Sequence, residues 1–253
     1  MKLHNFFPVW LAFALIAPTP AQTPLRLAAA ADLQPVLPPI LEQFRQSSGV
    51  RVEATYQASA MLTTQIMNGA PFDVFLSADL GYPRRLIDAG LAEGPAPTAY
   101  AKGTLVLWTR KDSALPPPSL DLLRDPGVKR LAIANPERAP YGRAAVAALN
   151  KLSLYEALKP RLVTAENIAQ AAQFADSGNA DAGLISLTSA MTPRMASAGT
   201  YFVMPRDLYP AIDQGAVIVS KSQQREQGRK LLDFLLSAPV QAQPAKNGLT
   251  PVH

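Results

Sequence analysis

The stretch from Asn68 to Asp79 reads NGAPFDVFLSAD, and it contains a turn followed by a short apolar run. Pro71 and Asp73 are typical of a turn. The run 74–76 that follows is apolar and short, which is typical of a strand. We therefore expect a turn that leads directly into a short strand at this place.

A helix is expected before this strand, because Leu62, Ile66 and Met67 recur at helical spacing. Its first residues follow the small loop 58–60, which contains the hydroxyl group of Ser59. The first N–H groups of a helix have no partner within the helix, so they can bind an anion. The loop and the helix together are a candidate anion site.

The rest of the chain also alternates strands and helices, which is typical of an α/β fold with mainly parallel sheets. The expected strands are 25–29, 50–56, 74–76, 104–109, 131–134, 182–187, 201–204 and 216–220. The expected helices run from the first strand toward residue 47 and over 60–67, 80–89, 120–124, 141–151, 168–175 and 224–236. Pro38 and Pro39 fall inside the first helix and predict that it is kinked or begins later.

The composition excludes several classes of protein. The chain of 253 residues has no cysteine and two histidines, His4 and His253, so neither a histidine-based catalytic triad nor a zinc centre is expected. The net charge of +5 comes from scattered residues and is too small to indicate nucleic acid as a partner. No pair of carboxylates has the pattern of acid–base catalysis, so we expect no enzyme.

Residues 1–21 predict a secretory signal. Lys2 precedes the apolar run 9–17, which is too short to span a bilayer, and Ala21 provides a small residue at the cleavage point. The alternative is an N-terminal membrane anchor, which Pro18 and Pro20 disfavour because they end the run. Because no cysteine can carry a lipid, the mature protein is expected to be free and soluble.

Four junctions between a strand and the next helix carry small or turn-forming residues: Ala31-Asp32, 58–60, 139–142 and 165–168. Ligands of open α/β sheets bind beyond the carboxyl ends of the strands. Four helix N-termini that meet at one cleft can hold a tetrahedral oxyanion without a cationic side chain. Because every α/β protein has such junctions, the pattern alone leaves open whether these four converge.

Five segments together resemble the periplasmic molybdate-binding proteins of ABC importers in order and spacing: 28–33, the run around Ser59, 68–79, 131–143 and 165–168. The resemblance implies a two-lobed periplasmic binding protein of type II. Each lobe would be a mainly parallel sheet flanked by helices, with the ligand in the cleft between the lobes. Residues 24–101 with 206–253 would form lobe one, and residues 102–205 lobe two.

The resemblance also implies the residues that bind the ligand. Ser59 is expected to donate its hydroxyl and its backbone N–H to the oxyanion, and Tyr141 and Ile168 to donate their backbone N–H groups. The alternatives are that Ser59 caps its own helix and that Ile168 is an ordinary core residue.

Two positions depart from the pattern of the family. Many members have a serine at the end of the first strand, where this chain has Ala31-Asp32. An ionised aspartate would repel a dianion, so we expect Asp32 to be a helix N-cap that points away, while the N–H of Ala31 or Asp32 faces the ligand. Several members have a tyrosine where this chain has Ser186, which either donates a hydrogen bond or packs at the strand end.

The function implied by the resemblance is to bind molybdate or tungstate in the periplasm and to deliver it to the membrane permease of an ABC importer, as a monomer and without a cofactor. Another oxyanion is an alternative: sulfate, or phosphate, whose proton would need an acceptor such as Asp32. An enzyme on the same fold is disfavoured by the lack of cysteine and of an internal histidine. Arg138, Arg143 and Arg194 are expected near the cleft as surface charges.

Overall fold

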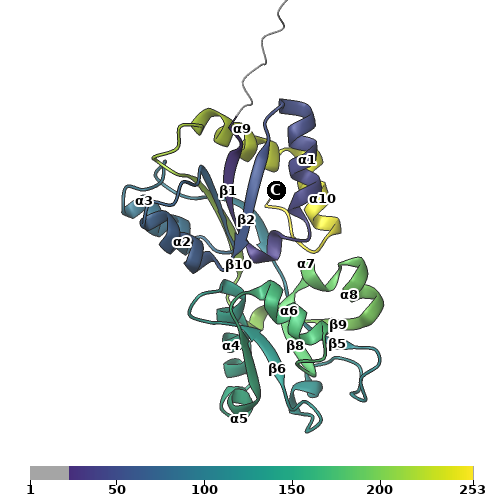
Figure 1. Cartoon of the computed structure of the whole chain (residues 1–253). Helices are drawn as coiled ribbons and strands as arrows, with labels where there is room; N and C mark the ends of the chain where they lie inside the picture. The colour runs from purple at the N-terminus through teal and green to yellow at the C-terminus, as the bar shows by residue number, and fades with distance from the viewer. Residues whose placement is uncertain (1–22, 253) are drawn as a thin grey trace, which may run out of the picture.

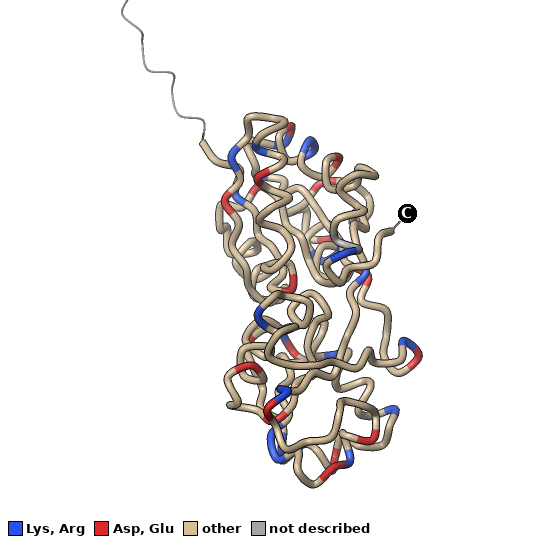
Figure 2. The backbone as a smooth tube through the Cα atoms, turned by 90° about the vertical axis from the view of Figure 1, so that its right-hand side faces the viewer, with Lys and Arg blue, Asp and Glu red and all other residues tan. Residues whose placement is uncertain are grey.

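The computed structural model describes residues 23–252, so the predicted signal over 1–21 lies outside the described residues. The chain forms two lobes, each built on one five-stranded sheet with helices packed against it (Figure 1). No helix within 23–252 is long and apolar enough to cross a membrane. Basic and acidic residues are mixed over both lobes (Figure 2).

The first sheet has the strand order β2-β1-β3-β10-β4. Its strands are β1 (Leu25–Ala30), β2 (Val52–Gln57), β3 (Val74–Ser77), β4 (Thr98–Gly103) and β10 (Ile212–Ile218). β1 pairs in parallel with β2 and β3, whereas β10 is antiparallel to its neighbours β3 and β4. All strands of this sheet except β10 therefore run in the same direction.

The second sheet has the order β7-β6-β8-β5-β9. Its strands are β5 (Leu105–Arg110), β6 (Leu131–Ala134), β7 (Leu162–Ala165), β8 (Ala182–Ser186) and β9 (Gly199–Val203). β6 pairs in parallel with β7 and β8, and β5 is antiparallel to β8 and β9. Both sheets are thus mainly parallel, and the fold class expected from the sequence is confirmed.

Helices cover the faces of both sheets (Figure 1). The α-helices are α1 (Leu37–Ser48), α2 (Ser59–Met67), α3 (Gly81–Asp88), α4 (Pro140–Lys151), α5 (Tyr155–Leu158), α6 (Ile168–Asp176), α7 (Leu187–Ala190), α8 (Pro193–Ala198), α9 (Arg225–Leu236) and α10 (Ala238–Lys246). Short 3₁₀ helices are η1 (Ala31–Leu33), η2 (Asp121–Arg124), η3 (Lys159–Arg161) and η4 (Arg206–Leu208). The helix expected over 120–124 is therefore a 3₁₀ helix.

The first helix begins later than its pattern suggested. α1 begins at Leu37, so Pro38 and Pro39 lie in its first turn, where the missing N–H groups cost no helical hydrogen bond. The helix ends before Gly49, which has a φ of +74° and caps it in the left-handed conformation. Of the two expectations for this helix, the later start is the correct one.

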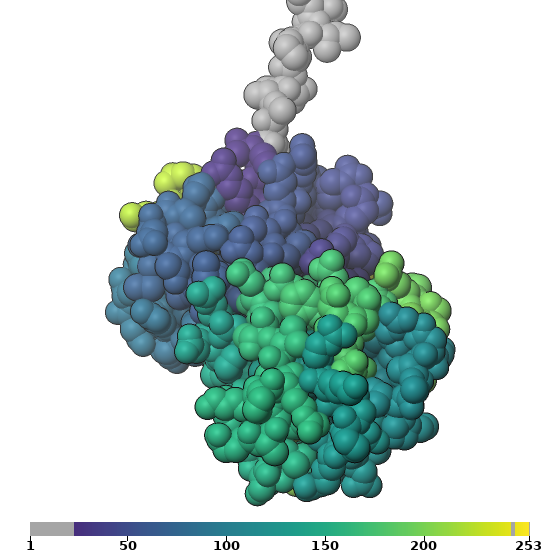
Figure 3. Space-filling view, turned by 60° about the horizontal axis from the view of Figure 1, so that its bottom comes forward, coloured from purple at the N-terminus to yellow at the C-terminus, as the bar shows by residue number. Residues whose placement is uncertain are grey.

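The chain passes between the two sheets twice, from β4 to β5 and from β9 to β10. At the first passage Gly103 packs closely against Tyr141, whose hydroxyl oxygen would lie 2.3 Å from an added Cβ. The buried core of the second lobe also continues into Ala31, Ala58 and Ala78 of the first. Figure 3 accordingly shows the two lobes in contact along their junction.

Candidate functional site

The carboxyl ends of strands from both sheets meet at one small cavity between the lobes. Its volume is about 200 Å³, including its opening to solvent. The lining residues follow or end strands β1, β2, β3, β6 and β7, and they are Ala30, Ala31, Asp32, Gln57, Ala58, Ser59, Ala78, Ala139, Pro140, Tyr141, Asn167 and Ile168. The four junctions identified in the sequence therefore converge. The cavity brings together all of the predicted binding residues except Ser186.

Ser59 is buried at the first position of α2. Its side chain makes no capping bond to its own helix, so the alternative interpretation as a helix cap is wrong. The Ser59 Oγ instead accepts a hydrogen bond of 3.1 Å from the N–H of Ala78, which follows β3. No acceptor for the Ser59 O–H is found within residues 23–252, so this hydrogen is available to a ligand in the cavity.

Three helices begin at the cavity: α2 at Ser59, α4 at Pro140 and α6 at Ile168. The N–H groups of Ser59, Tyr141 and Ile168 lie in first turns, where the helix itself offers no acceptor. The N–H of Ala60 is already used, since it donates to the carbonyl oxygen of Arg138 (3.1 Å) in the other lobe. Free N–H groups and aligned helix dipoles favour an anion at the cavity, although its lining contains no basic side chain.

The first turn of α6 is held by reciprocal side-chain bonds. Asn167 caps the helix, and its Oδ1 accepts from the N–H of Gln170 (3.0 Å). The Gln170 Oε1 in turn accepts from the N–H of Glu166 (2.7 Å). These bonds satisfy two exposed donors of the helix end and leave the N–H of Ile168 at the cavity.

Asp32 does not have the position predicted for it. The N-cap of η1 is Ala30, with no side-chain cap, and Asp32 lies within η1 with its side chain fully buried. Its Oδ2 accepts hydrogen bonds from the Tyr141 hydroxyl (3.1 Å) and from Gln214 Nε2. Its Oδ1 is buried and has no hydrogen-bond partner within the described residues. The N-cap prediction is wrong because partners distant in the sequence determine where this carboxyl group lies.

Burial changes the acid–base properties of Asp32 and Tyr141. Burial raises the pKa of Asp32 to about 6, against the opposing effect of the hydrogen bonds from Gln214 and Tyr141. Burial and the neighbouring charge of Asp32 raise the pKa of Tyr141 well above its usual value. Tyr141 therefore remains a hydrogen-bond donor, while Asp32 can exchange a proton near neutral pH.

Ser186 does not line the cavity. It is buried and caps α7, where its Oγ accepts from the N–H of Ser189 (3.3 Å). The Thr188 hydroxyl lies 2.9 Å from this oxygen and donates to the backbone carbonyl of Asp32 (2.8 Å). Of the two roles considered for Ser186, the position fits packing at the strand end.

The three arginines expected near the cleft do not line the cavity. Arg143 reaches across to the first lobe, where it donates to the Tyr82 hydroxyl (3.1 Å) and pairs with the Asp79 carboxylate. Arg194 pairs with Asp176 within the second lobe. The roles of Gln214, Thr188 and Tyr82 were not predicted, and no local pattern around them indicates these long-range contacts.

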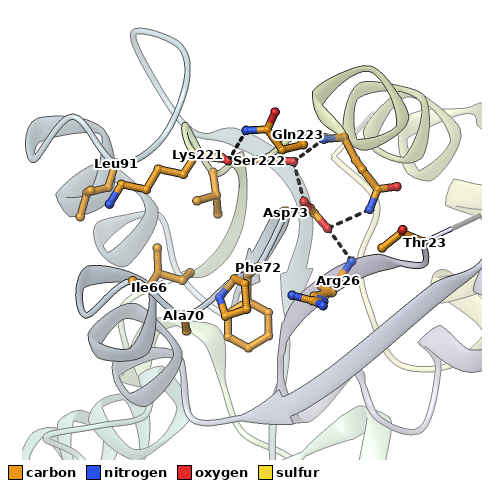
Figure 4. A pocket seen from close by; sticks show the side chains of 14 residues that line it. Thr23, Arg26, Ile66, Ala70, Phe72, Asp73, Leu91, Lys221, Ser222 and Gln223 are labelled. Atoms are coloured by element: carbon orange, nitrogen blue, oxygen red, sulfur yellow. Dashed lines mark hydrogen bonds between the residues drawn. The ribbon is translucent and has the colours of Figure 1, made fainter.

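A second hollow lies at the opposite ends of β1 and β3, around Asp73 (Figure 4). Both carboxylate oxygens of Asp73 are satisfied there, by the Arg26 N–H (2.7 Å) and the Ser222 hydroxyl (2.6 Å). None of the buried polar atoms that lack a partner within the described residues lines this hollow. Among the described residues it therefore has no buried polar atom without a partner, unlike the cavity between the lobes.

Two α/β lobes joined by two passages of the chain, with helix N-termini from both lobes around one cavity, define a two-lobed solute-binding protein. A family model described as bacterial extracellular solute-binding protein matches residues 25–250. The chain belongs to this family.

Several curated relatives of the chain are named molybdate-binding proteins. The molybdate-binding protein ModA of Azotobacter vinelandii is 37% identical over 227 residues, which cover 90% of each protein. The protein of the same name from Rhodobacter capsulatus is 36% identical over 192 residues, 76% of this chain and 74% of the relative.

Solved structures show the same fold. The periplasmic molybdate-binding protein of Azotobacter vinelandii superposes with a TM-score of 0.85 at 29% identity, over 90% of this chain and all of the other. The sulfate-binding protein SubI of Mycobacterium tuberculosis has a TM-score of 0.76 at 19% identity, over 91% of this chain and 88% of the other. Because the same fold occurs in a molybdate-binding and a sulfate-binding protein, the fold alone does not choose the anion.

Proposed function

We propose that this protein binds molybdate or tungstate and serves as the periplasmic component of an ABC importer. The observation that carries the proposal is the cavity, whose lining contains helix N-termini and a serine hydroxyl but no lysine or arginine. A buried dianion needs a hydrogen bond at every oxygen, and neutral donors favour ions that carry no proton of their own. The molybdate-binding names of the relatives agree with this chemistry.

Each predicted residue then has a role in the bound state. Ser59 donates its hydroxyl and backbone N–H, and Tyr141 and Ile168 donate their backbone N–H groups. The N–H of Ala31 or Asp32 provides a further donor from the first strand end. Ser186 supports the site through Thr188, which donates to the Asp32 carbonyl (2.8 Å).

The lobes close over the ligand by rotating about the two chain passages. We place lobe one at 24–101 with 206–253 and lobe two at 102–205. The closed form is the state that the membrane permease recognises, and the ion is cargo, so neither a cofactor nor catalysis is required. The protein acts as a monomer in the periplasm after cleavage near Ala21.

A thermal-shift series on the mature protein with molybdate, tungstate, sulfate and phosphate tests the proposal. A ligand at 100 times its dissociation constant adds about 2.7 kcal/mol to the free energy of unfolding, which raises the melting temperature measurably. The expected result is a large rise with molybdate and tungstate and little with sulfate. A rise with phosphate alone would favour phosphate transport, which the unpartnered Asp32 Oδ1 makes the second candidate.

A further inference from the structure

Asp32 is an unusual residue in the lining of an anion cavity, because its side chain is a carboxyl group. Four buried side-chain atoms within 23–252 lack a hydrogen-bond partner, and Asp32 Oδ1 is the one that belongs to a residue lining the cavity. A buried polar atom without a partner is costly, so a ligand that satisfies it is favoured. An oxygen of a bound oxyanion is, however, also an acceptor and cannot satisfy Oδ1 by itself.

The two oxygens of Asp32 have different surroundings. Oδ2 accepts from both the Tyr141 hydroxyl (3.1 Å) and Gln214 Nε2, as the carbonyl oxygen of a carboxylic acid does. Oδ1 receives no hydrogen bond from the described residues. This asymmetry makes Oδ1 the atom on which a proton would sit, and a protonated Oδ1 is a donor.

We infer that the site takes up one proton from solvent with each molybdate or tungstate ion, and that Asp32 Oδ1 holds this proton and donates it to an oxygen of the anion. The inference rests on the proposed function and adds a stoichiometry to it. The bound proton removes the repulsion between an ionised carboxylate and a dianion. No basic side chain in the lining offsets this repulsion.

The other ionisable groups around Asp32 agree with this assignment. Two of them are the hydroxyls of Tyr141 on α4 and Tyr100 on β4. Burial and the charge of Asp32 raise the pKa values of both. The third is Tyr209, which interacts electrostatically with Tyr141. Asp79 contributes a further negative charge near Tyr100. Tyr100 and Tyr141 stay neutral, so the carboxyl group of Asp32 is the group that titrates.

The pH dependence of binding follows from linkage. In the free protein Asp32 has a pKa of about 6, so above this pH it is ionised and must gain a proton when the anion binds. The dissociation constant should therefore rise with pH above about 6, by up to about tenfold per pH unit, and should level off below it.

Isothermal titration calorimetry with sodium molybdate at pH 8, in Tris and in HEPES, measures the proton count, because the two buffers differ in ionisation enthalpy. The expected result is an uptake of about one proton per anion by the wild-type protein. Asp32→Asn keeps the shape of the side chain and should abolish both the uptake and the pH dependence. Asp176→Asn, at a partly buried acid that pairs with Arg194 within the second lobe and lies outside the cavity lining, should keep both.

Two results would overturn the inference while leaving the proposed function intact. One is tight molybdate binding by the wild-type protein without proton uptake and with the same affinity from pH 6 to pH 8.5. The other is an Asp32→Asn protein that keeps the wild-type pH dependence. If that variant does not fold, the proton count of the wild type still decides. A wild-type protein that binds no molybdate at any of these pH values would instead overturn the proposed function.

Discussion

The Ser59 side chain divides its hydrogen bonding between the protein and the cavity. Its oxygen accepts from the Ala78 N–H (3.1 Å), which fixes the rotamer and leaves the O–H to the ligand. Ser59→Ala should weaken molybdate binding by about 10- to 100-fold, or about 1.5–3 kcal/mol for a hydrogen bond to a charged group. Calorimetric titration measures this loss.

Ser186→Ala is the matched control for this prediction. Ser186 is also a fully buried serine, but it caps α7 and lies outside the cavity lining. Its replacement should cost less affinity than that of Ser59. Equal losses from the two variants would show that the Ser59 hydroxyl does not contact the anion.

The Asp32 carboxyl group should also make folding stability depend on pH. Its pKa is about 6 in the folded protein, above the ordinary value of 3.8, so the folded state binds the proton more tightly. The resulting stability is fully present below pH 3.8 and is lost as the pH rises through 6. Between these limits the wild type should lose on the order of 3 kcal/mol relative to Asp32→Asn. Urea unfolding of both proteins at pH 4 and pH 8 measures the difference, and parallel pH profiles would contradict it.

The sequence predicted the position of Ser59 better than that of Asp32. Ser59 lies at the cavity, where the small loop before its helix and the resemblance to the molybdate-binding proteins had suggested an anion site. Asp32 was misplaced because its partners Tyr141 and Gln214 lie 109 and 182 residues away. A local pattern of a strand followed by an acid resembles an N-cap, and only the folded chain brings the competing donors to the carboxyl group.

At the scale of elements, α4 depends on a close approach to β6. Gly142 lies in the first turn of α4, where an added Cβ would come within 2.3 Å of the Ala134 carbonyl oxygen. Gly142→Ala should therefore push α4 away from the sheet, cost about 1–3 kcal/mol of stability and weaken anion binding, because the Tyr141 N–H moves with the helix. Thermal unfolding and calorimetry measure the two effects.

Gly81→Ala provides the comparison, because Gly81 also lies in the first turn of a helix, α3. The nearest atom to its added Cβ is a carboxylate oxygen of Asp79 at 3.8 Å, an ordinary contact. This variant should unfold at the wild-type temperature or above it. If Gly142→Ala were as stable as Gly81→Ala, the close packing of α4 on β6 would not determine the stability of the protein.

The elements that the sequence did not predict have weak patterns of their own. β4 reads TAYAKG, with one large apolar residue, Tyr100, and exposed or half-exposed residues at both ends. β7 has four residues, LVTA, one of them fully buried, and forms the edge of its sheet. Long apolar strands such as β5 were recognised because burial on both faces requires continuous apolar residues. β4 and β7 are stabilised by pairing with their neighbouring strands. The local sequence pattern does not indicate this pairing.

At the scale of the whole molecule, contacts across the cavity hold the two lobes together. Arg143 of α4 donates to the Tyr82 hydroxyl (3.1 Å), lies 5.3 Å from the centre of the Tyr82 ring and pairs with Asp79 of the first lobe. We call these three residues the clasp. Its side chains are partly exposed, with 44% of the Arg143 side chain and 20% of that of Asp79 accessible to solvent, so its contribution is screened.

The clasp should act on release of the ligand more than on its capture. A partly exposed ion pair with a cation–π contact contributes on the order of 1 kcal/mol, so Arg143→Gln should speed molybdate dissociation by about 2- to 10-fold. Association should change little, because the clasp lies outside the cavity lining and makes no contact with the entering ion. Arg194→Gln removes the same charge but breaks a pair with Asp176 within the second lobe, so molybdate should dissociate from this variant at the wild-type rate.

Stopped-flow fluorescence measures the dissociation rates of both variants, and the difference between them should shrink at high salt. Equal dissociation rates for the two variants would mean that other contacts between the lobes, such as the bond from the Ala60 N–H to the Arg138 carbonyl oxygen (3.1 Å), hold the closed form.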